Sequence, residues 1–233
     1  MGRRSALLTA CVWCCLLVCF ATAAMTLAQD SRPAQTQPVG PKSVALPKPV
    51  TEGGKPLMEA LKSRQSIREF GPRKLPDQVL SNLLWAACGI SRPESGKRTA
   101  PTASNRQEID VYVCTADGVW LYDAKEHALA PVLAQDIRAL TGTQDFVKDA
   151  PVNLVFVADF ARMGKGPDED KKWVAGADTG FVSQNVYLFC ASEGLVTVVR
   201  GMIKRPELAK AMNLRSDQWI VLAQTVGYPK AKP

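Results

Sequence analysis

The strongest constraint on the fold is the run from Val152 to Ala158, which is almost continuously apolar. Such a run is typical of a β-strand that is buried on both faces of its sheet. Helical and strand-like patterns alternate around this run, but not in the regular order of a βαβ series. We therefore expect a single domain of the α+β class.

Apolar spacing and turn signals place the other elements of this domain. Helices are predicted at 57–64, 76–88, about 173–192 and near 206–212. Further strands are predicted at 109–114, 119–122, 196–199 and 219–226. The first two of these strands flank Asp117-Gly118, a dipeptide typical of tight hairpin turns.

The N-terminal segment has the pattern of an export signal. Arg3 and Arg4 precede an uncharged stretch, 5–29, that ends in small residues. This pattern predicts a signal peptide over residues 1–28, cleaved after Ala28, and therefore a periplasmic protein. The apolar run approaches the roughly 20 residues that span a bilayer, so an uncleaved anchor facing the periplasm is the alternative.

Cysteine positions argue against a disulfide framework. Four of the seven cysteines lie inside the predicted signal peptide. The other three, Cys88, Cys114 and Cys190, are widely spaced and have apolar neighbours. We expect them to be buried free thiols, not a disulfide or a metal site.

A proline-rich stretch follows the signal. Six prolines fall between Ser31 and Pro56, with little apolar periodicity. The sequence therefore predicts an extended tether over residues 29–55 and one folded domain over residues 56–233.

Charge and histidine content exclude several classes of function. The net charge of +7 falls to +5 without residues 1–28, since 27 basic and 22 acidic residues remain. No zinc-finger spacing, basic run or aromatic–basic RNA motif accompanies this charge, which disfavours nucleic-acid binding. His127 is the only histidine, which excludes a histidine-rich metal site. The sequence also shows no credible nucleophile–base pair, which argues against hydrolase chemistry. Neither a G-x-G-x-x-G motif nor a Walker loop is present.

Two polar clusters are candidate binding sites. In the segment 64–68, two guanidinium groups and a hydroxyl can converge on a phosphate, because arginine donates in a planar fork. The alternative for this segment is a solvated basic end of a helix. The segment 98–107 carries many hydrogen-bonding side chains just before a strand, and is either a binding loop or a plain surface loop.

The long predicted helix carries a third candidate surface. Polar and aromatic residues share one stripe at helical spacing, whereas ordinary core stripes are apolar. This mixture indicates a helix that packs against another subunit or a ligand, or else a surface helix with satisfied polar groups. The stripe consists of Asp178, Phe181, Asn185, Phe189 and Ser192.

Taken together, these motifs resemble the nitroreductase family of FMN-dependent oxidoreductases over roughly residues 56–230. They occur in the family's order: Arg64-Gln65-Ser66-Ile67-Arg68, Pro101 to Gln107, Asp178-Thr179-Gly180, Ser192-Glu193-Gly194-Leu195 and Gly227-Tyr228-Pro229. The resemblance implies a central, mostly antiparallel sheet flanked by helices. It also implies a homodimer with two FMN sites at the interface.

The resemblance also assigns roles to residues. Arg64, Ser66 and Arg68 would hold the FMN phosphate, Asn105 would contact the flavin ring, and the backbone at Glu193-Gly194 would lie near the reactive nitrogen of the flavin. Lys230 or Lys232 would complete the phosphate site. The full set implied for cofactor binding is Arg64, Gln65, Ser66, Arg68, Pro101, Thr102, Ala103, Asn105, Gln107, Glu193, Gly194, Leu195, Lys230 and Lys232.

The implied activity is ping-pong transfer of a hydride or electrons through FMN to a small nitroaromatic or quinone-like acceptor, with NAD(P)H as a candidate donor. No catalytic side chain and no metal site are expected, because the cofactor supplies the chemistry. Two alternatives remain: dehydrogenation of a peptide-derived azoline ring on the same fold, and a flavin-binding protein without catalysis. Nucleic acid is not an expected partner, and the membrane is one only if the N-terminal segment stays uncleaved.

Overall fold

A computed structural model describes residues 42–231 of the chain. The predicted signal peptide and Lys232 lie outside the described residues. The centre of the domain is a seven-stranded sheet in the order β1-β6-β5-β4-β7-β9-β8, in which every neighbouring pair is antiparallel. A separate two-stranded ribbon, β2–β3, completes the strands of this part of the chain. The α+β class and the antiparallel sheet are both confirmed.

The elements have the following bounds. The strands are β1 (Val44–Ala45), β2 (Ile90–Arg92), β3 (Lys97–Arg98), β4 (Ile109–Thr115), β5 (Gly118–Asp123), β6 (Ala128–Leu133), β7 (Val152–Asp159), β8 (Val196–Arg200) and β9 (Gln218–Gly227). The α-helices are α1 (Leu57–Ser63), α2 (Asp77–Cys88), α3 (Asp168–Glu193) and α4 (Arg205–Ala211). Short 3-10 turns are η1 (Ala103–Asn105), η2 (Arg138–Leu140), η3 (Asp145–Val147) and η4 (Phe160–Met163).

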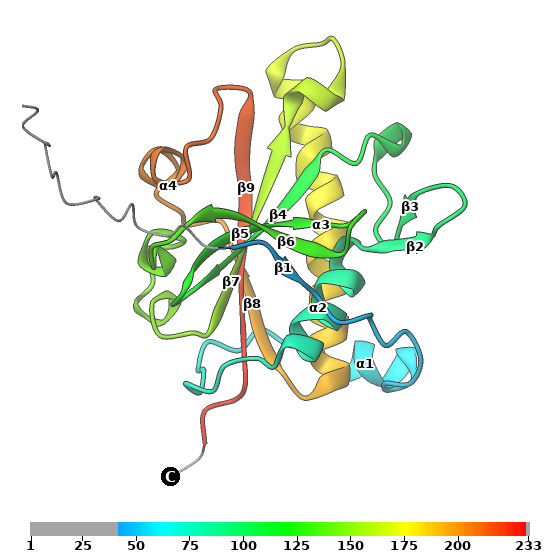
Figure 1. Cartoon of the computed structure of the whole chain (residues 1–233), viewed down its shortest axis with the longest axis vertical. Coiled ribbons are helices and arrows are strands. Elements are labelled where there is room, and N and C mark those ends of the chain that lie inside the picture. Colours follow the sequence, from blue (N-terminus) through cyan, green and yellow to red (C-terminus); the bar gives the residue numbers. More distant parts are fainter. Residues whose placement is uncertain (1–41, 232–233) are drawn as a thin grey trace, which may run out of the picture. The chain divides into compact units, whose positions relative to one another are not determined.

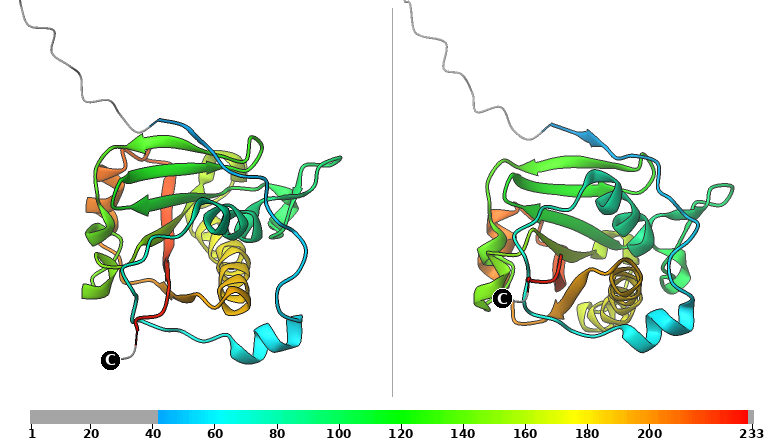
Figure 2. Two further views of the ribbon diagram at one scale, coloured as in Figure 1. Left: turned by 60° about the horizontal axis from the view of Figure 1, so that its bottom comes forward. Right: turned by 90° about the horizontal axis from the view of Figure 1, so that it is seen from below.

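Strand β7 lies in the middle of the sheet, between β4 and β9, and its apolar side chains point alternately into two cores. Leu154 and Phe156 pack in the core that α2 and α3 cover, whereas Val155 and Val157 pack in the core that α4 covers. Figures 1 and 2 show α2 and α3 on one side of the sheet and the smaller α4 on the other. Burial on both faces explains why this strand has a continuous apolar run.

The last part of the proline-rich stretch, residues 44–55, lies against the folded body, and we call it the strap. It begins as the edge strand β1, which pairs with β6. It then crosses α2, where the carbonyl of Pro47 accepts from Ser81 Oγ (2.6 Å) and lies 3.1 Å from His127 Nε2. Its end reaches α3, where the Lys55 amide donates to Ser192 Oγ at 2.9 Å. From Val44 on, therefore, the predicted tether is part of the packed structure.

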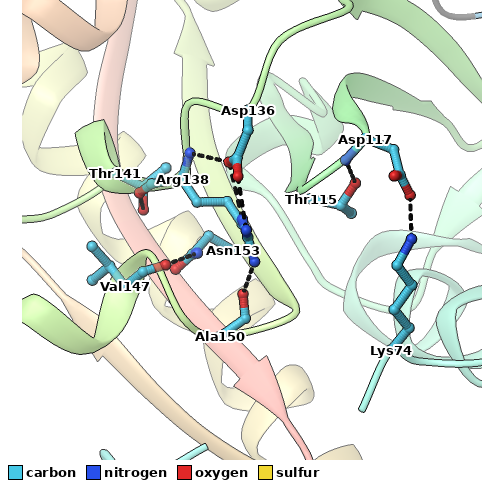
Figure 3. A network of polar contacts seen from close by, with 9 residues as sticks. All are labelled: Lys74, Thr115, Asp117, Asp136, Arg138, Thr141, Val147, Ala150 and Asn153. Carbon is cyan, nitrogen blue, oxygen red and sulfur yellow. Dashed lines mark hydrogen bonds and ion pairs between the residues drawn. The ribbon is translucent and has the colours of Figure 1, made fainter. Parts of the chain in front are cut away.

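Loops between the sheet strands are fixed by a polar network on the side of the molecule drawn in Figure 3. Lys74 Nζ pairs with Asp117 at the β4–β5 turn (2.8 Å), and Arg138 pairs with Asp136 (2.7 Å). Arg138 Nη1 also donates to the carbonyl of Ala150 at 2.8 Å. None of the residues drawn in this network belongs to the predicted cofactor site.

Two further features of the described chain matter for function. Cys88, Cys114 and Cys190 are buried free thiols, as predicted, and burial raises the pKa of Cys88 to about 11. Such thiols stay protonated and unreactive at neutral pH. Across residues 42–231, no helix combines the length and the apolar character that a membrane crossing requires.

Candidate functional site

The arginine cluster lies where α1 ends and the chain runs beside β8. The amide of Ile67 donates to the carbonyl of Thr197 at 3.0 Å, which fixes the segment against the sheet. Ser66 and the exposed Arg68 flank this anchor. Among the described residues, no carboxylate pairs with either Arg64 or Arg68, so both guanidinium groups can bind an anion.

Tyr187, on α3, organises this cluster, although its role was not evident from the sequence. Its ring lies under the Arg64 guanidinium, with 5.0 Å between Cζ and the ring centroid. Its hydroxyl is hydrogen-bonded to the Ser66 hydroxyl (2.7 Å) and accepts from the Val199 amide (3.0 Å). Because α3 and β8 both hold Tyr187, the positions of Arg64 and Ser66 are set before any ligand binds.

The C-terminal motif lies beside the same segment. Phe70 forms a β-bridge with Pro229, and the Gly71 amide donates to the Tyr228 carbonyl at 2.8 Å. Lys230 is exposed next to this bridge. The structure thus brings the chain at Lys230 near the segment that carries Arg68.

Glu193 and Gly194 form the end of α3. Gly194 adopts the left-handed conformation (φ 69°) that ends many helices, and its amide and the Leu195 amide both donate to the Cys190 carbonyl. Glu193 is exposed, and its carboxylate accepts from Ser192 Oγ at 3.1 Å. The two amides after Glu193 therefore already have a partner within the chain.

A small cavity of about 130 Å³ lies between the segment 63–67 and the end of α3. Its lining includes Gln65, Tyr187, Gly194 and Leu195, whereas Arg64, Ser66 and Arg68 do not line it. A wider cleft of about 790 Å³ lies between the strap, α2 and the end of α3, and reaches Glu193. Pockets that enclose a ligand usually hold roughly 300–1,000 Å³. The small cavity can hold only part of a flavin, whereas the adjoining cleft has the size of a ligand site.

The second predicted loop, residues 101–107, is held in a conformation that is uncommon for its residue types. Ser104, Asn105 and Gln107 have positive φ values of 55°, 53° and 52°. Such positions cost on the order of 1–3 kcal/mol each for most residues other than glycine, although asparagine tolerates them better. They persist because Gln107 donates two hydrogen bonds within the loop, from its backbone amide to Thr102 Oγ1 (2.9 Å) and from its Nε2 to Asn105 Oδ1 (3.1 Å). Strain held in this way is common at ligand sites.

This loop is tied to α3 through Asp178. The Ala103 amide donates to Asp178 Oδ2 at 2.9 Å, and Asp178 is only 3% exposed. Beside them lies Glu108, which is fully buried and was not identified from the sequence because a lone glutamate before a strand carries no signal. Burial, followed by a hydrogen bond with Asp178, raises the pKa of Glu108 to about 7.

Within one chain the two parts of the predicted site are far apart. Asp178 and Glu193 lie on the same helix, and about 1.5 Å of rise per residue separates them by roughly 22 Å. The structure therefore brings Arg64, Ser66, Arg68, Gly194 and Lys230 to one end of α3. The loop with Asn105 lies beside the other half of the helix.

The helical stripe predicted from the sequence does not form one surface. Asp178 is buried against the loop, Phe181 is exposed, and Asn185, Phe189 and Ser192 are half-buried along the cleft. The exposed face of α3 instead carries Trp173, Ala177, Gly180 and Phe181. Small residues and an exposed aromatic side chain on one helix face are typical of a surface that a second chain covers.

Comparison with known proteins identifies the class. The family model for the nitroreductase family matches residues 61–228, and this chain belongs to that family. Its members are flavin oxidoreductases and generally bind FMN. A nitroreductase-like protein of Methanocaldococcus jannaschii is 29% identical over 181 residues, which are 73% of this chain and 90% of that protein.

Solved structures agree with this assignment. A crystal structure from Ralstonia eutropha, described as that of a nitroreductase, is 42% identical, with a TM-score of 0.79 over 84% of this chain and 93% of that one. A chain of the E. coli microcin synthetase McbBCD complex has a TM-score of 0.63 over 90% of this chain and 84% of that one. Its identity is 20%, so this second likeness shows the fold alone.

The residues present fit the phosphate end of FMN. Two guanidinium groups that pair with no carboxylate within residues 42–231, together with the Ser66 hydroxyl, offer charge-assisted donors, which phosphate groups prefer. The described residues contain no group of three or more histidine, cysteine or acidic side chains placed to hold a metal ion.

Proposed function

We propose that this chain is an FMN-dependent oxidoreductase that transfers a hydride or electrons to a small acceptor such as a nitroaromatic compound or a quinone. The observation that carries the proposal is the cluster of Arg64, Ser66 and Arg68, in which Tyr187 holds Arg64 and Ser66 in place and neither arginine has a carboxylate partner among the described residues. Lys230 directly follows Pro229, which forms a β-bridge with Phe70, and it would add a third cation to the phosphate site. Bound FMN would supply the redox chemistry.

The protein's own residues then bind and orient. Arg64 and Arg68 would neutralise the phosphate, and Ser66 would donate a hydrogen bond to it, while the Tyr187 hydroxyl donates to Ser66 Oγ. Asn105 and Gln107 lie in a loop fixed by internal hydrogen bonds, which reduces the ordering cost when a flavin edge docks against it. No side chain needs to act as a nucleophile in this scheme.

A homodimer would bring the two parts of the site together. On one chain they are roughly 22 Å apart along α3. In a two-fold dimer whose α3 helices run antiparallel, the loop at Asp178 of one protomer would face the Glu193 end of the other. The exposed Phe181 and the open space beside Gly176 and Gly180 fit such an approach.

The donor and the place of action are part of the same proposal. NAD(P)H is the donor expected for such chemistry, in a ping-pong order in which donor and acceptor use the same flavin in turn. If the predicted export signal acts, the protein would carry FMN into the periplasm already folded, or take electrons there from a different donor. The residues proposed to bind the flavin are the same in both cases.

The decisive test is the absorption spectrum of the purified chain, followed by denaturation and chromatography of any released cofactor. One FMN per chain, reduced by NADH or NADPH without air and reoxidised by a nitroaromatic compound or a quinone, would agree with the proposal. Reoxidation no faster than with free FMN would indicate a flavin-binding protein without catalysis. A colourless protein that does not take up added FMN would refute the proposal.

A further inference from the structure

Glu108 is a buried acid that the flavin scheme leaves without a role. It is the last residue before β4, its exposure is 0%, and neither carboxyl oxygen has a hydrogen-bond donor among the described residues. An ionised carboxylate in such a place would be strongly disfavoured, because burial removes the water that stabilises its charge. The position is therefore suited to a protonated acid.

Asp178 supplies the acceptor for that proton. It is 3% exposed and within hydrogen-bonding reach of the Glu108 carboxyl group, and its Oδ2 already accepts the Ala103 amide at 2.9 Å. Two carboxyl groups in contact away from water do not both remain ionised, and one proton shared between them removes the repulsion. Burial and this bond are also the two largest reasons why the pKa of Glu108 rises to about 7.

Arg162 is the cation that acts on this pair, and its charge lowers the pKa of Glu108 less than burial and Asp178 raise it, because Arg162 is shared with other carboxylates. Arg162 pairs with Asp110 at 2.6 Å, and its Nε lies 3.4 Å from Asp159. Its two terminal nitrogens also donate to the carbonyls of Gln107 and Glu108. The charged groups that act on the pair or on these partners are Asp178 on α3, Arg162 in η4, Asp110 on β4, Asp159 at the end of β7, Arg98 on β3 and Arg215 before β9.

We propose that Glu108 is a positioning residue: as a protonated acid it donates to Asp178, Asp178 holds the Ala103 amide, and one proton thereby fixes the loop 101–107. The inference rests on the proposed function only in assigning that loop to FMN. The link between the proton and the loop does not depend on the flavin.

The loop needs this anchor because of its conformation. Three of its residues have positive φ, and the Asp178 bond is its tie to α3. When the pH rises and Glu108 loses its proton to solvent, two adjacent negative charges repel each other. The carboxylate of Asp178 then moves or becomes hydrated, and the Ala103 amide loses its partner.

The test compares the wild type with Glu108→Gln, which keeps the shape and a donor to Asp178 but cannot ionise. The first measurement is hydrogen exchange at the Ala103 amide of the flavin-free protein, expressed as a protection factor at about pH 6 and about pH 8.5. We expect protection to fall about tenfold in the wild type, the factor that corresponds to one pKa unit, and to stay nearly constant in the variant. The second measurement is the FMN dissociation constant at the same two pH values, which should rise several-fold in the wild type alone.

Asp178→Asn is the second variant, and it keeps the test valid if Glu108→Gln does not fold. It removes the neighbouring charge while leaving an oxygen for the Ala103 amide, so its protection factor should depend on pH much less than that of the wild type. Equal protection at both pH values in the wild type, or the same fall in wild type and variants, would overturn the inference. A fall in protection without any FMN binding would support the link between proton and loop and refute the proposed function instead. If the protection factor fell with pH but the FMN affinity did not change, the loop would not contribute to flavin binding. The role of Glu108 in positioning the loop for FMN would then be wrong.

Discussion

At the scale of single residues, two arginines that look alike in the sequence have different surroundings. Arg64 is half-buried over the Tyr187 ring, so its position is fixed by packing as well as by charge. Arg68 is exposed and has no carboxylate partner among the described residues. A ligand anion would therefore be the main partner of Arg68.

Replacing Arg68 with alanine should weaken FMN binding by about 1.5–3 kcal/mol, the usual contribution of a hydrogen bond to a charged group. The free energy of unfolding of the flavin-free protein should hardly change, because this exposed side chain makes no hydrogen bond or ion pair within residues 42–231. Fluorescence titration with FMN measures the first quantity, and denaturant unfolding measures the second.

Lys62→Ala is the matched control for this change. It also removes one exposed positive charge, at the last turn of α1, but outside the predicted phosphate site. Equal losses of affinity in both variants would mean that only the general positive field of this region matters, and the phosphate role of Arg68 would be wrong.

Among the elements, strand patterns and motif order were readable from the sequence, but the strap and β6 were not. Strand β6 contains Pro131, and a proline within a short run argues against a strand. It is tolerated here because Pro131 lies beyond the two residues that pair with β1, so its missing donor faces an open edge. Helix α3 begins earlier than predicted because Pro167 and three acidic residues start it, which favours a helix without adding to apolar periodicity.

The strap is held by His127, for which the sequence indicated no chemical role and which makes structural contacts. Its Nδ1 is hydrogen-bonded to Tyr122 Oη (2.9 Å), and its Nε2 lies within bonding distance of Ser81 Oγ (2.7 Å) and the Pro47 carbonyl. Burial lowers the pKa of His127, so the ring is neutral at pH 7. His127 therefore connects α2, the β5–β6 turn and the strap.

We expect His127→Ala to lower the free energy of unfolding by about 1–3 kcal/mol, because it leaves the buried Tyr122 hydroxyl without a partner. His127→Asn should lose less, since asparagine tolerates the left-handed backbone found there and can still form a hydrogen bond. Turnover per folded molecule should match the wild type in both variants, as measured by flavin reduction below the unfolding temperature. A selective loss of turnover would reveal an acid–base role for this histidine.

On the scale of the whole molecule, the sequence could supply the motifs but not the distances between them. The order of the motifs does not reveal that the motifs at Asp178 and Glu193 lie on one helix, α3, roughly 22 Å apart. Nor could it identify Glu108 and Tyr187, whose roles arise only when a strand and a helix pack side by side. In the proposed function, therefore, the site is complete only in the dimer.

This last point can be tested on the exposed face of α3. Phe181 is 48% exposed, and a glutamate there would place a charge in the proposed interface. Phe181→Glu should yield a monomer and lower the amount of bound FMN in proportion, because each flavin would lose the loop of the second chain. Light scattering after size-exclusion chromatography measures the mass, and absorbance in the same run measures the flavin.

Lys210→Glu, on the exposed side of α4, makes the same kind of surface change away from α3 and should leave both quantities unaltered. The two readouts must change together if the site is shared between protomers. A monomeric variant that keeps its FMN would show that one chain suffices, and the Asn105 loop would then have to be removed from the flavin site. A dimer that has lost FMN would place Phe181 against the flavin itself and leave the interface elsewhere.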